Sequence, residues 1–326
     1  MAYIDASLDR FRPGQWFDGW VRERVRERRG TVVLPFHLEY RHIYVMPTRF
    51  GAWFGVLLAL TIVGGLNFNN NMALLFGFTL AAIAQLTSFL SYRNLVGLTL
   101  TSIQAGPVFA GETAHFRVFI NNPEPRYRYA LQLRSEEAAD ALDIEPSRSA
   151  CFVLQQQTGS RGWMQMDPFN LESRIPLGMF RAWSVIIPYS RCLVYPRPAN
   201  NPPPLPRTGR GEEGIAKAGE GEQFHGLRKY RPGDPLRSIA WRASARHDSL
   251  YSQVMEAPRE EACELNWYLM GALGVEEKLS ILAAWILLAE RRQIPYSLEL
   301  PSDALPAALG QEHRDACLKI LALYGT

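Results

Sequence analysis

The sequence predicts a multidomain membrane protein with a two-helix transmembrane hairpin, a β-sandwich and a small C-terminal α/β domain. Three observations carry this prediction. Residues 50–92 contain no Lys, Arg, Asp or Glu. Residues 93–198 hold short runs of β-branched and aromatic residues separated by turn signals, and residues 223–326 contain a strand–helix–strand pattern. A chain of 326 residues is long enough for separate domains that each bury a core.

The predicted hairpin consists of Phe50–Leu66 and Met72–Leu90, joined by the uncharged loop NFNNN at residues 67–71. Each span is close to the ~20 apolar residues that cross a bilayer. A helix pair in a soluble core would show a polar face, which is missing here. A signal peptide is not expected, because the apolar run starts near residue 50 and no cleavage sequence follows it. Nine Arg precede the first span and Arg93 follows the second, so both ends are expected in the cytoplasm.

Residues 1–49 form a basic N-terminal segment with nine Arg and six Asp or Glu. Within residues 14–30, Trp16, Phe17 and Trp20 precede a run of arginines. This pattern favours an interfacial helix on an anionic membrane surface. The alternative is a solvated helix stabilised by Arg–Glu pairs.

Residues 93–198 read as a soluble β domain. Runs such as HFRVFINN and YALQLRS alternate apolar and polar residues, and AGP, FAGE and NNPEP are turn signals. Roughly 100 residues of this kind predict an immunoglobulin-like β-sandwich. The segments RGWMQM (161–166) and PLGMFRAW (176–183) are interpreted as structural corners, and no catalytic constellation is evident in this domain.

Residues 199–222 are Pro-rich and then Gly/Glu-rich, which is typical of an interdomain linker or surface loop. They contain a formal GxGxxG, but it follows a polyproline stretch and includes two glutamates, so it is not interpreted as a phosphate site. GxxxxGK[ST], HExxH and GxSxG do not occur in the sequence. The four cysteines form no CxxC pair, so buried reduced thiols are expected rather than disulfides or a metal site.

Nucleic acid is not an expected partner. Residues 93–326 carry 26 basic and 26 acidic residues, whereas a nucleic-acid-binding domain normally shows a strong basic excess.

The most unusual stretch is GLRKYRPGDPLRSIAWRASAR, residues 226–246, with six cationic side chains and one acid. Pro232 and Gly233 predict a β-turn, and Asp234 before Pro235 predicts a helix start. Arg237 and Trp241 lie four residues apart, so the guanidinium is expected on the indole ring. The candidate residues for binding a partner or an anion are Arg228, Arg231, Arg237, Arg242 and Arg246. In the competing interpretation these arginines pair internally with flanking glutamates.

This block, continued by SLYSQVMEAP, resembles the bacterial family called domain of unknown function 58. The likeness extends through PLGMFRAW, VYPRP and the paired spans with their NNN loop, over roughly residues 45–326. The structural signature residues of the block are Pro232, Gly233, Asp234, Trp241 and Ser244. The resemblance implies an adaptor or assembly role with a MoxR-type AAA+ ATPase, often linked to the cell envelope, and a von Willebrand factor A-like C-terminal fold. It implies no established catalytic activity. With the spans and their flanking arginines, the expected location is the bacterial inner membrane.

The C-terminal pattern fits a shortened version of that fold. We expect a buried strand over residues 262–270, an amphipathic helix over 275–293, a second strand over 295–302 and a closing helix over 313–325. A metal-binding von Willebrand A domain needs DxSxS at the end of its first strand. The corresponding positions here are Asn266, Tyr268 and Met270. A degenerate domain without metal or cofactor is therefore expected.

The function predicted from these patterns is a non-enzymatic membrane-anchored adaptor or scaffold. It would work with a MoxR-type AAA+ ATPase in cell-envelope assembly and contact membrane lipids, and homo-oligomerisation is left open. The alternative is a protein or enzyme that uses the arginines of residues 228–246 to bind an anion or a phosphate-bearing ligand.

Overall fold

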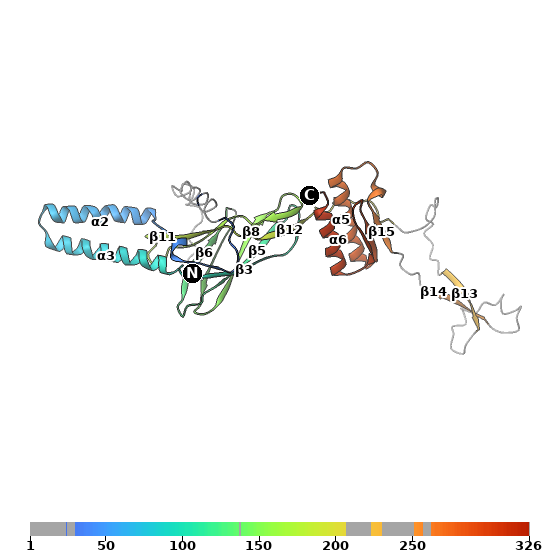
Figure 1. The fold of residues 1–326 in the computed structure, drawn as a ribbon, viewed down its shortest axis with the longest axis horizontal. Coiled ribbons are helices and arrows are strands. Elements are labelled where there is room, and N and C mark those ends of the chain that lie inside the picture. The colour runs from blue at the N-terminus through green and yellow to red at the C-terminus, as the bar shows by residue number, and fades with distance from the viewer. Residues whose placement is uncertain are drawn as a thin grey trace. The chain divides into compact units, whose positions relative to one another are not determined.

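The computed structural model describes residue 24 and residues 30–136, 138–206 and 262–325, together with the backbone of residues 223–229 and 251–256. The chain divides into two compact units, Met1–Tyr195 and Pro196–Thr326, which are treated separately (Figure 1). The segment in which an interfacial helix is expected, residues 14–30, lies almost entirely outside the described residues.

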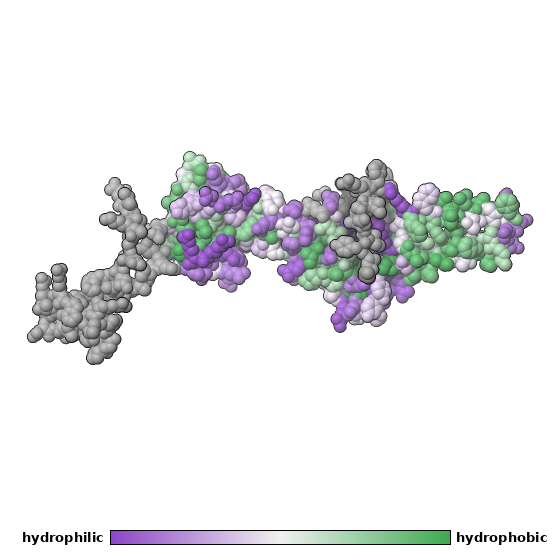
Figure 2. Space-filling view, turned by 180° about the vertical axis from the view of Figure 1, so that it is seen from behind, coloured by the Kyte–Doolittle hydropathy of each residue, from purple (hydrophilic) through white to green (hydrophobic). Residues whose placement is uncertain are grey.

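The first unit contains the predicted hairpin, formed by α2 (Arg49–Asn67) and α3 (Asn71–Arg93). Thr48 and Asn70 cap the N-termini of α2 and α3 by accepting hydrogen bonds from backbone N–H groups. Both helices are long and apolar enough to cross a membrane, and only 6% and 11% of their apolar windows are buried. Figure 2 shows the resulting hydrophobic surface over the hairpin. This exposure is not that of helices in a soluble core and fits membrane association.

The two helices pack through small residues. A Cβ added at Gly65 would lie 3.0 Å from the Leu74 side chain, and one added at Gly77 would lie 2.8 Å from Ile62. Small residues at these positions let two helices approach closely when lipid offers no hydrophobic driving force between them.

The rest of this unit is built from short strands, as predicted. One sheet has the order β1-β3-β5-β8, and a second has the order β2-β11-β10-β6-β7. The strands of the first sheet are β1 (Phe36–His37), β3 (Thr99–Ala105), β5 (Thr113–Asn121) and β8 (Ser149–Gln157). Those of the second are β2 (Tyr44–Pro47), β6 (Arg128–Arg134), β7 (Ala139–Ile144), β10 (Phe169–Ser173) and β11 (Phe180–Ile186). All strand pairs in these two sheets are antiparallel.

A third, smaller sheet has the order β4-β12-β9, from β4 (Val108–Phe109), β12 (Arg191–Tyr195) and β9 (Gly162–Gln165). RGWMQM therefore contains a strand rather than a corner, because residues 162–165 pair with β12. PLGMFRAW begins as a loop and continues as β11.

The core of the sandwich lies between the two larger sheets. Phe116 and Phe152 from the first sheet share one buried cluster with Leu133, Phe169 and Leu171 from the second. The strand β5 alternates buried and more exposed residues, as a half-buried strand requires. The antiparallel sandwich is thus confirmed, and its immunoglobulin-like topology stays a prediction.

The second unit contains the predicted strand–helix–strand order. Its elements are β15 (Cys263–Asn266), the 3₁₀ helix η4 (Trp267–Met270), α5 (Val275–Arg292), β16 (Tyr296–Glu299), β17 (Ala304–Ala308) and α6 (Gln311–Leu323). β15 and β16 are parallel and joined through α5, so the βαβ unit and the closing helix are confirmed. The antiparallel strand β17 was not expected.

The strand β15 is shorter than predicted. It ends at Asn266, whose side-chain oxygen accepts a hydrogen bond from the Tyr268 N–H at 2.8 Å. This local bond turns the chain into η4, because an Asn side chain competes with the sheet for backbone donors.

Residues 199–206, at the start of the predicted linker, lie against the α/β core. The Trp285 indole N–H donates to the Pro203 carbonyl at 2.8 Å, and the Ala199 N–H donates to the Ser280 carbonyl at 3.0 Å. The Cys263 thiol donates to the Pro206 carbonyl. The same unit contains the antiparallel pair β13 (Gln223–Lys229) and β14 (Tyr251–Glu256).

Candidate functional site

The predicted arginine site is described only at its first residue. Arg228 belongs to β13, where its backbone lies opposite Ser252 of β14. The other residues of the site and its signature lie outside the described residues: Arg231, Pro232, Gly233, Asp234, Arg237, Trp241, Arg242, Ser244 and Arg246. Whether these arginines bind a partner, an anion or internal acids therefore stays a prediction.

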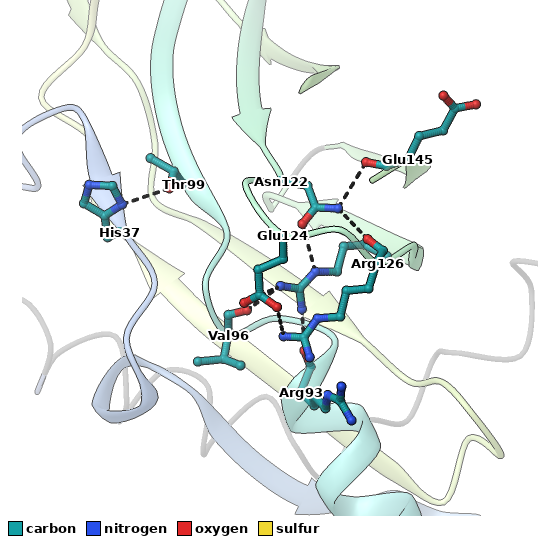
Figure 3. Close-up of polar contacts among 9 residues, drawn as sticks. His37, Arg93, Val96, Thr99, Asn122, Glu124, Arg126 and Glu145 are labelled. Atoms are coloured by element: carbon teal, nitrogen blue, oxygen red, sulfur yellow. Dashed lines mark hydrogen bonds and ion pairs between the residues drawn. The ribbon is translucent and has the colours of Figure 1, made fainter. Parts of the chain in front are cut away.

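The best-defined polar cluster is the junction between the hairpin and the sandwich, which we call the junction cluster: Arg93, Val96, Asn122, Glu124, Arg126 and Arg128 (Figure 3). Its centre is Arg128, the first residue of β6, whose side chain is fully buried. Its guanidinium donates hydrogen bonds to the backbone carbonyls of Arg93 and Val96, the latter at 2.7 Å. These carbonyls lie at the C-terminal end of α3, where helical partners run out and the dipole favours a cation.

Acid and amide groups complete the junction cluster. Arg128 donates to the Asn122 side-chain oxygen at 3.2 Å and pairs with Glu124 at 3.3 Å. Asn122 in turn donates to the carbonyls of Arg126 and Glu145 at 2.7 and 3.1 Å (Figure 3). Burial is the main cause that lowers the pKa of Arg128 to about 10. The nearby charge of Arg126 also lowers this pKa, whereas the Glu124 carboxylate raises it. Arg128 therefore keeps its charge at neutral pH.

Glycine suits the turn beside this cluster. The φ of Gly97 is +83°, in the left-handed region that favours glycine, and a Cβ there would displace the Glu124 carboxylate from its present position. Glycine therefore lets the turn after α3 bring its carbonyls to Arg128 without backbone strain.

The last turn of α3 also binds the second sheet directly. Asn94 donates from its amide group to the Tyr129 carbonyl at 2.8 Å and to the Ser173 hydroxyl at 2.7 Å. Its oxygen accepts from the Tyr129 N–H at 3.2 Å. One side chain thereby links α3 to both β6 and the end of β10.

The loop Arg174–Met179, between β10 and β11, is held by both helices. The Ser91 hydroxyl donates to the Ile175 carbonyl at 2.6 Å. The Thr48 hydroxyl donates to the Gly178 carbonyl at 2.6 Å, and the Thr48 N–H donates to the Met179 carbonyl at 2.8 Å. We call this segment the 174–179 loop. It fixes the sandwich to the start of α2 and the end of α3.

A buried acid lies just inside the 174–179 loop. The Glu172 side chain on β10 is fully buried, and its Oε2 accepts a hydrogen bond from Arg181 Nε at 2.6 Å. Arg174 and Arg134 lie 3.6 and 4.0 Å from its Oε1. The Arg181 guanidinium also lies 4.8 Å from the centre of the Trp183 ring. Several cations around one carboxylate compensate the desolvation of that acid.

In the C-terminal unit, one group superficially resembles a nucleophile site. The Cys317 thiol lies 3.6 Å from His313 Nε2. That nitrogen is 2.9 Å from the Tyr296 carbonyl, which can only accept, so the nitrogen carries the proton and cannot act as a base. Burial, with Glu290 as a second cause, raises the pKa of the Cys317 thiol to about 12. The cysteine is therefore a neutral packing residue, because reactivity needs the thiolate.

Glu290 completes this C-terminal group. Its Oε1 accepts from the Tyr296 hydroxyl at 3.0 Å and from the Gly310 N–H at 3.1 Å, which ties α5 to β16 and to the start of α6. Burial is the main reason that the pKa of Tyr296 is raised. The group therefore stabilises the unit.

The positions expected to have lost a metal site are all described. The Asn266 amide donates to Glu299 at 2.6 Å, Tyr268 is exposed and Met270 is buried. Among the described residues, three or more His, Cys, Asp or Glu side chains do not come together in a way that could hold a metal ion.

Sequence reasoning missed the junction cluster and the Glu172 group. The signal for Glu172 was available, since it is a lone acid in the otherwise uncharged strand FNLES. Arg128 gave no such signal, because it lies in PEPRYRY among other exposed-looking charges.

The two apolar helices and the several β-sheets fit a membrane-anchored multidomain protein. Residues 226–271 match the family model described as "Protein of unknown function DUF58", which supports the resemblance to that family. The match begins within β13 and ends just after η4. Among curated proteins and solved structures, none matches this chain.

Proposed function

We propose that this protein is a non-enzymatic membrane-anchored scaffold that holds a cytoplasmic docking unit for a MoxR-type AAA+ ATPase. The observation that carries the proposal is the junction between hairpin and sandwich. Arg128, Asn94, Ser91 and Thr48 connect the helix ends to the sheets through hydrogen bonds. These hydrogen bonds fix the orientation of the sandwich relative to the two helices, as a scaffold requires.

The proposed location is the bacterial inner membrane with both chain ends in the cytoplasm. Eight Arg precede α2, Arg49 begins it and Arg93 ends α3, while the loop between the helices is uncharged. Charge retained on one side of a two-helix hairpin places that side in the cytoplasm.

The proposed docking element is the arginine block of residues 228–246. It lies within the segment that matches the family model. In the first unit, by contrast, several arginines bind groups within the protein. Arg128 donates to a backbone carbonyl, and Arg181 donates to Glu172. An arginine-rich block suits an acidic partner surface, where arginines increase the rate and specificity of association.

The test is co-purification from detergent of the full-length protein with a MoxR-type ATPase from the same bacterium. Wild type is compared with Arg228→Glu and Arg237→Glu. Arg291→Glu is the matched control, because Arg291 is an exposed arginine on α5 outside the block. We expect capture by wild type and by the control, and loss of capture by both block variants.

Two outcomes count against the proposal. Absence of ATPase from the wild-type sample removes the partner. Equal loss in the Arg291→Glu control shows that charge reversal acts nonspecifically and removes the assignment to the block. Circular dichroism of each variant identifies loss caused by unfolding.

A further inference from the structure

The 174–179 loop lies at the level of the helix ends that face the sandwich. Its carbonyls accept hydrogen bonds from Thr48, which caps α2, and from Ser91, in the last turn of α3. The uncharged stretch of the hairpin begins at Phe50 and ends at Tyr92. An α-helix of 19 residues is about 28 Å long, close to the ~30 Å of a hydrocarbon core. If α2 and α3 span the membrane, the loop lies where hydrocarbon meets headgroups.

Part of the loop backbone is paired within the protein. The carbonyls of Ile175, Gly178 and Met179 bond to the hairpin, and the Arg174 carbonyl accepts from the Gly178 N–H at 2.8 Å. Pro176 has no N–H to satisfy. Each backbone group paired in this way lowers the cost of bringing the loop close to a low-dielectric layer, where water is not available.

The tip of the loop is apolar and exposed. Leu177 is 53% exposed and Pro176 is also exposed, while the neighbouring Met179 is buried. The apolar surface of the hairpin continues at this level, with Phe50 59% and Trp53 75% exposed. An apolar tip next to an apolar helix surface extends one membrane-facing surface rather than forming a separate patch.

Two exposed arginines lie near the loop in the chain or at the adjoining helix end: Arg174 starts the loop, and Arg93 ends α3 two residues after Ser91. Arg174 at the start of the loop is exposed, and its only ion pair among the described residues is the 3.6 Å contact with Glu172. The Arg93 side chain is exposed and has no hydrogen bond or ion pair with another described residue, and Figure 3 shows it directed away from the junction contacts. Guanidinium groups at this depth match the phosphates of lipid headgroups, to which they donate paired hydrogen bonds.

We infer that the 174–179 loop is a third membrane contact of this protein, specific for anionic phospholipid. Pro176 and Leu177 enter the boundary between acyl chains and headgroups, and Arg93 and Arg174 bind lipid phosphates beside them. The inference rests on the proposed membrane location of the hairpin. The contact would fix the tilt of the sandwich relative to the bilayer by a surface in addition to the two spans.

The test uses the full-length protein reconstituted in vesicles of phosphatidylglycerol and phosphatidylcholine. Cys151→Ser removes the one native thiol that is not buried. Leu177→Cys in that background is labelled with an environment-sensitive fluorophore, and quenching by doxyl-labelled lipids is measured. We expect strong quenching, with doxyl-phosphatidylglycerol more effective than doxyl-phosphatidylcholine at equal mole fraction.

Two further labelling sites serve as the negative and the positive control. Ser160→Cys is a near-isosteric change at an exposed site beyond the end of β8. In the β5–β8 pair, Asn121 beside the junction cluster opposes Ser149 and Thr113 opposes Gln157, so Ser160 lies at least about 27 Å along the strand direction from the junction end. We expect no quenching there. Leu60→Cys, exposed in the middle of α2, should be quenched whenever the hairpin spans the bilayer.

The arginines are tested by Arg93→Gln and by Arg93→Gln combined with Arg174→Gln. The single variant changes a side chain without described contacts, so it isolates lipid binding from folding. Each substitution should reduce the preference for phosphatidylglycerol, by about fivefold per arginine.

The outcomes distinguish failure of the loop's lipid contact from failure of the proposed membrane location of the hairpin. If Leu60→Cys is quenched and Leu177→Cys is as unquenched as Ser160→Cys, the loop does not contact lipid and the inference is wrong. If the loop label responds equally to both lipids, its anionic specificity is wrong. If Leu60→Cys itself is unquenched, the membrane location fails, and the inference fails with it.

Discussion

The guanidinium of Arg128 lies 2.7 Å from the backbone carbonyl oxygen of Val96, just past the end of α3. A buried cation thus provides hydrogen-bond donors to backbone carbonyls at the end of α3 that have no partner within the helix. The same residue starts β6, so one side chain belongs to the sandwich and also completes the end of α3.

Arg128→Met should therefore destabilise the first unit by at least about 3 kcal/mol. It leaves the carbonyls of Arg93 and Val96 and the Asn122 oxygen without their donor, at about 1–3 kcal/mol for each buried unsatisfied group. Chemical denaturation in detergent, followed by tryptophan fluorescence, measures the free energy of unfolding. Arg148→Met is the control, because the Arg148–Glu145 pair is exposed and should contribute less than about 1 kcal/mol. Equal effects of the two variants would contradict the role of Arg128.

Glu172 and Arg181 should be energetically coupled. Glu172→Gln leaves Arg181 without its buried counter-charge, and Arg181→Met leaves Glu172 with weaker partners. Each single change should destabilise the protein, and the double variant should be less destabilised than the sum, with a coupling energy of about 1–3 kcal/mol. A double-mutant cycle of unfolding free energies gives this number. Strict additivity would show that the two side chains do not act as a pair.

Cys317 should make the C-terminal unit less stable in alkali. Burial and Glu290 raise the thiol pKa to about 12 from an ordinary value of 9.0. Between these values the folded state keeps a proton that the unfolded state has lost. The stabilisation by the neutral thiol is therefore complete below pH 9 and is lost as the pH rises towards 12, by about 1.4 kcal/mol per pH unit.

The measurement is the pH dependence of the unfolding free energy for wild type minus that for Cys317→Ala. Cys263, whose pKa burial also raises, is present in both proteins and cancels in the difference. In the folded protein Cys317 should also resist alkylation at pH 8. A difference that does not change with pH, or rapid alkylation, would mean that the thiol is not held neutral.

Membrane topology gives a further prediction. A reporter fused after Thr326 should be active in its cytoplasmic form only, because the basic residues that flank the hairpin are retained on that side. A reporter inserted in the loop between α2 and α3 should show the opposite behaviour. Periplasmic activity after Thr326 would place the arginine block away from any cytoplasmic ATPase.

Elements with a strong local pattern could be predicted from the sequence. The hairpin follows from a long uncharged stretch, and α5 follows from an apolar periodicity with acids in the first turn and arginines in the last. The parallel pairing of β15 with β16 follows from the helix between them. These signals lie within one segment and need no distant partner.

The junction could not be predicted in the same way. Arg128 binds carbonyls that lie more than 30 residues earlier in the chain. Every residue has a backbone carbonyl, so the sequence gives no sign of which ones an arginine binds. The 174–179 loop resembled an ordinary corner, because its role depends on where Thr48 and Ser91 lie in the folded unit. The end of β15 at Asn266 was missed for a local reason: the Asn266 side chain turns the chain into η4, so residues 267–270 form a 3₁₀ helix instead of the predicted end of the strand.

The attachment of one loop to both helices has a mechanical consequence. Thr48 holds the 174–179 loop at its far end, and Ser91 holds it at Ile175. The helices therefore cannot slide past each other without breaking a short hydrogen bond at one side of the loop. Torque applied to the sandwich would therefore reach α2 and α3 together rather than one helix alone.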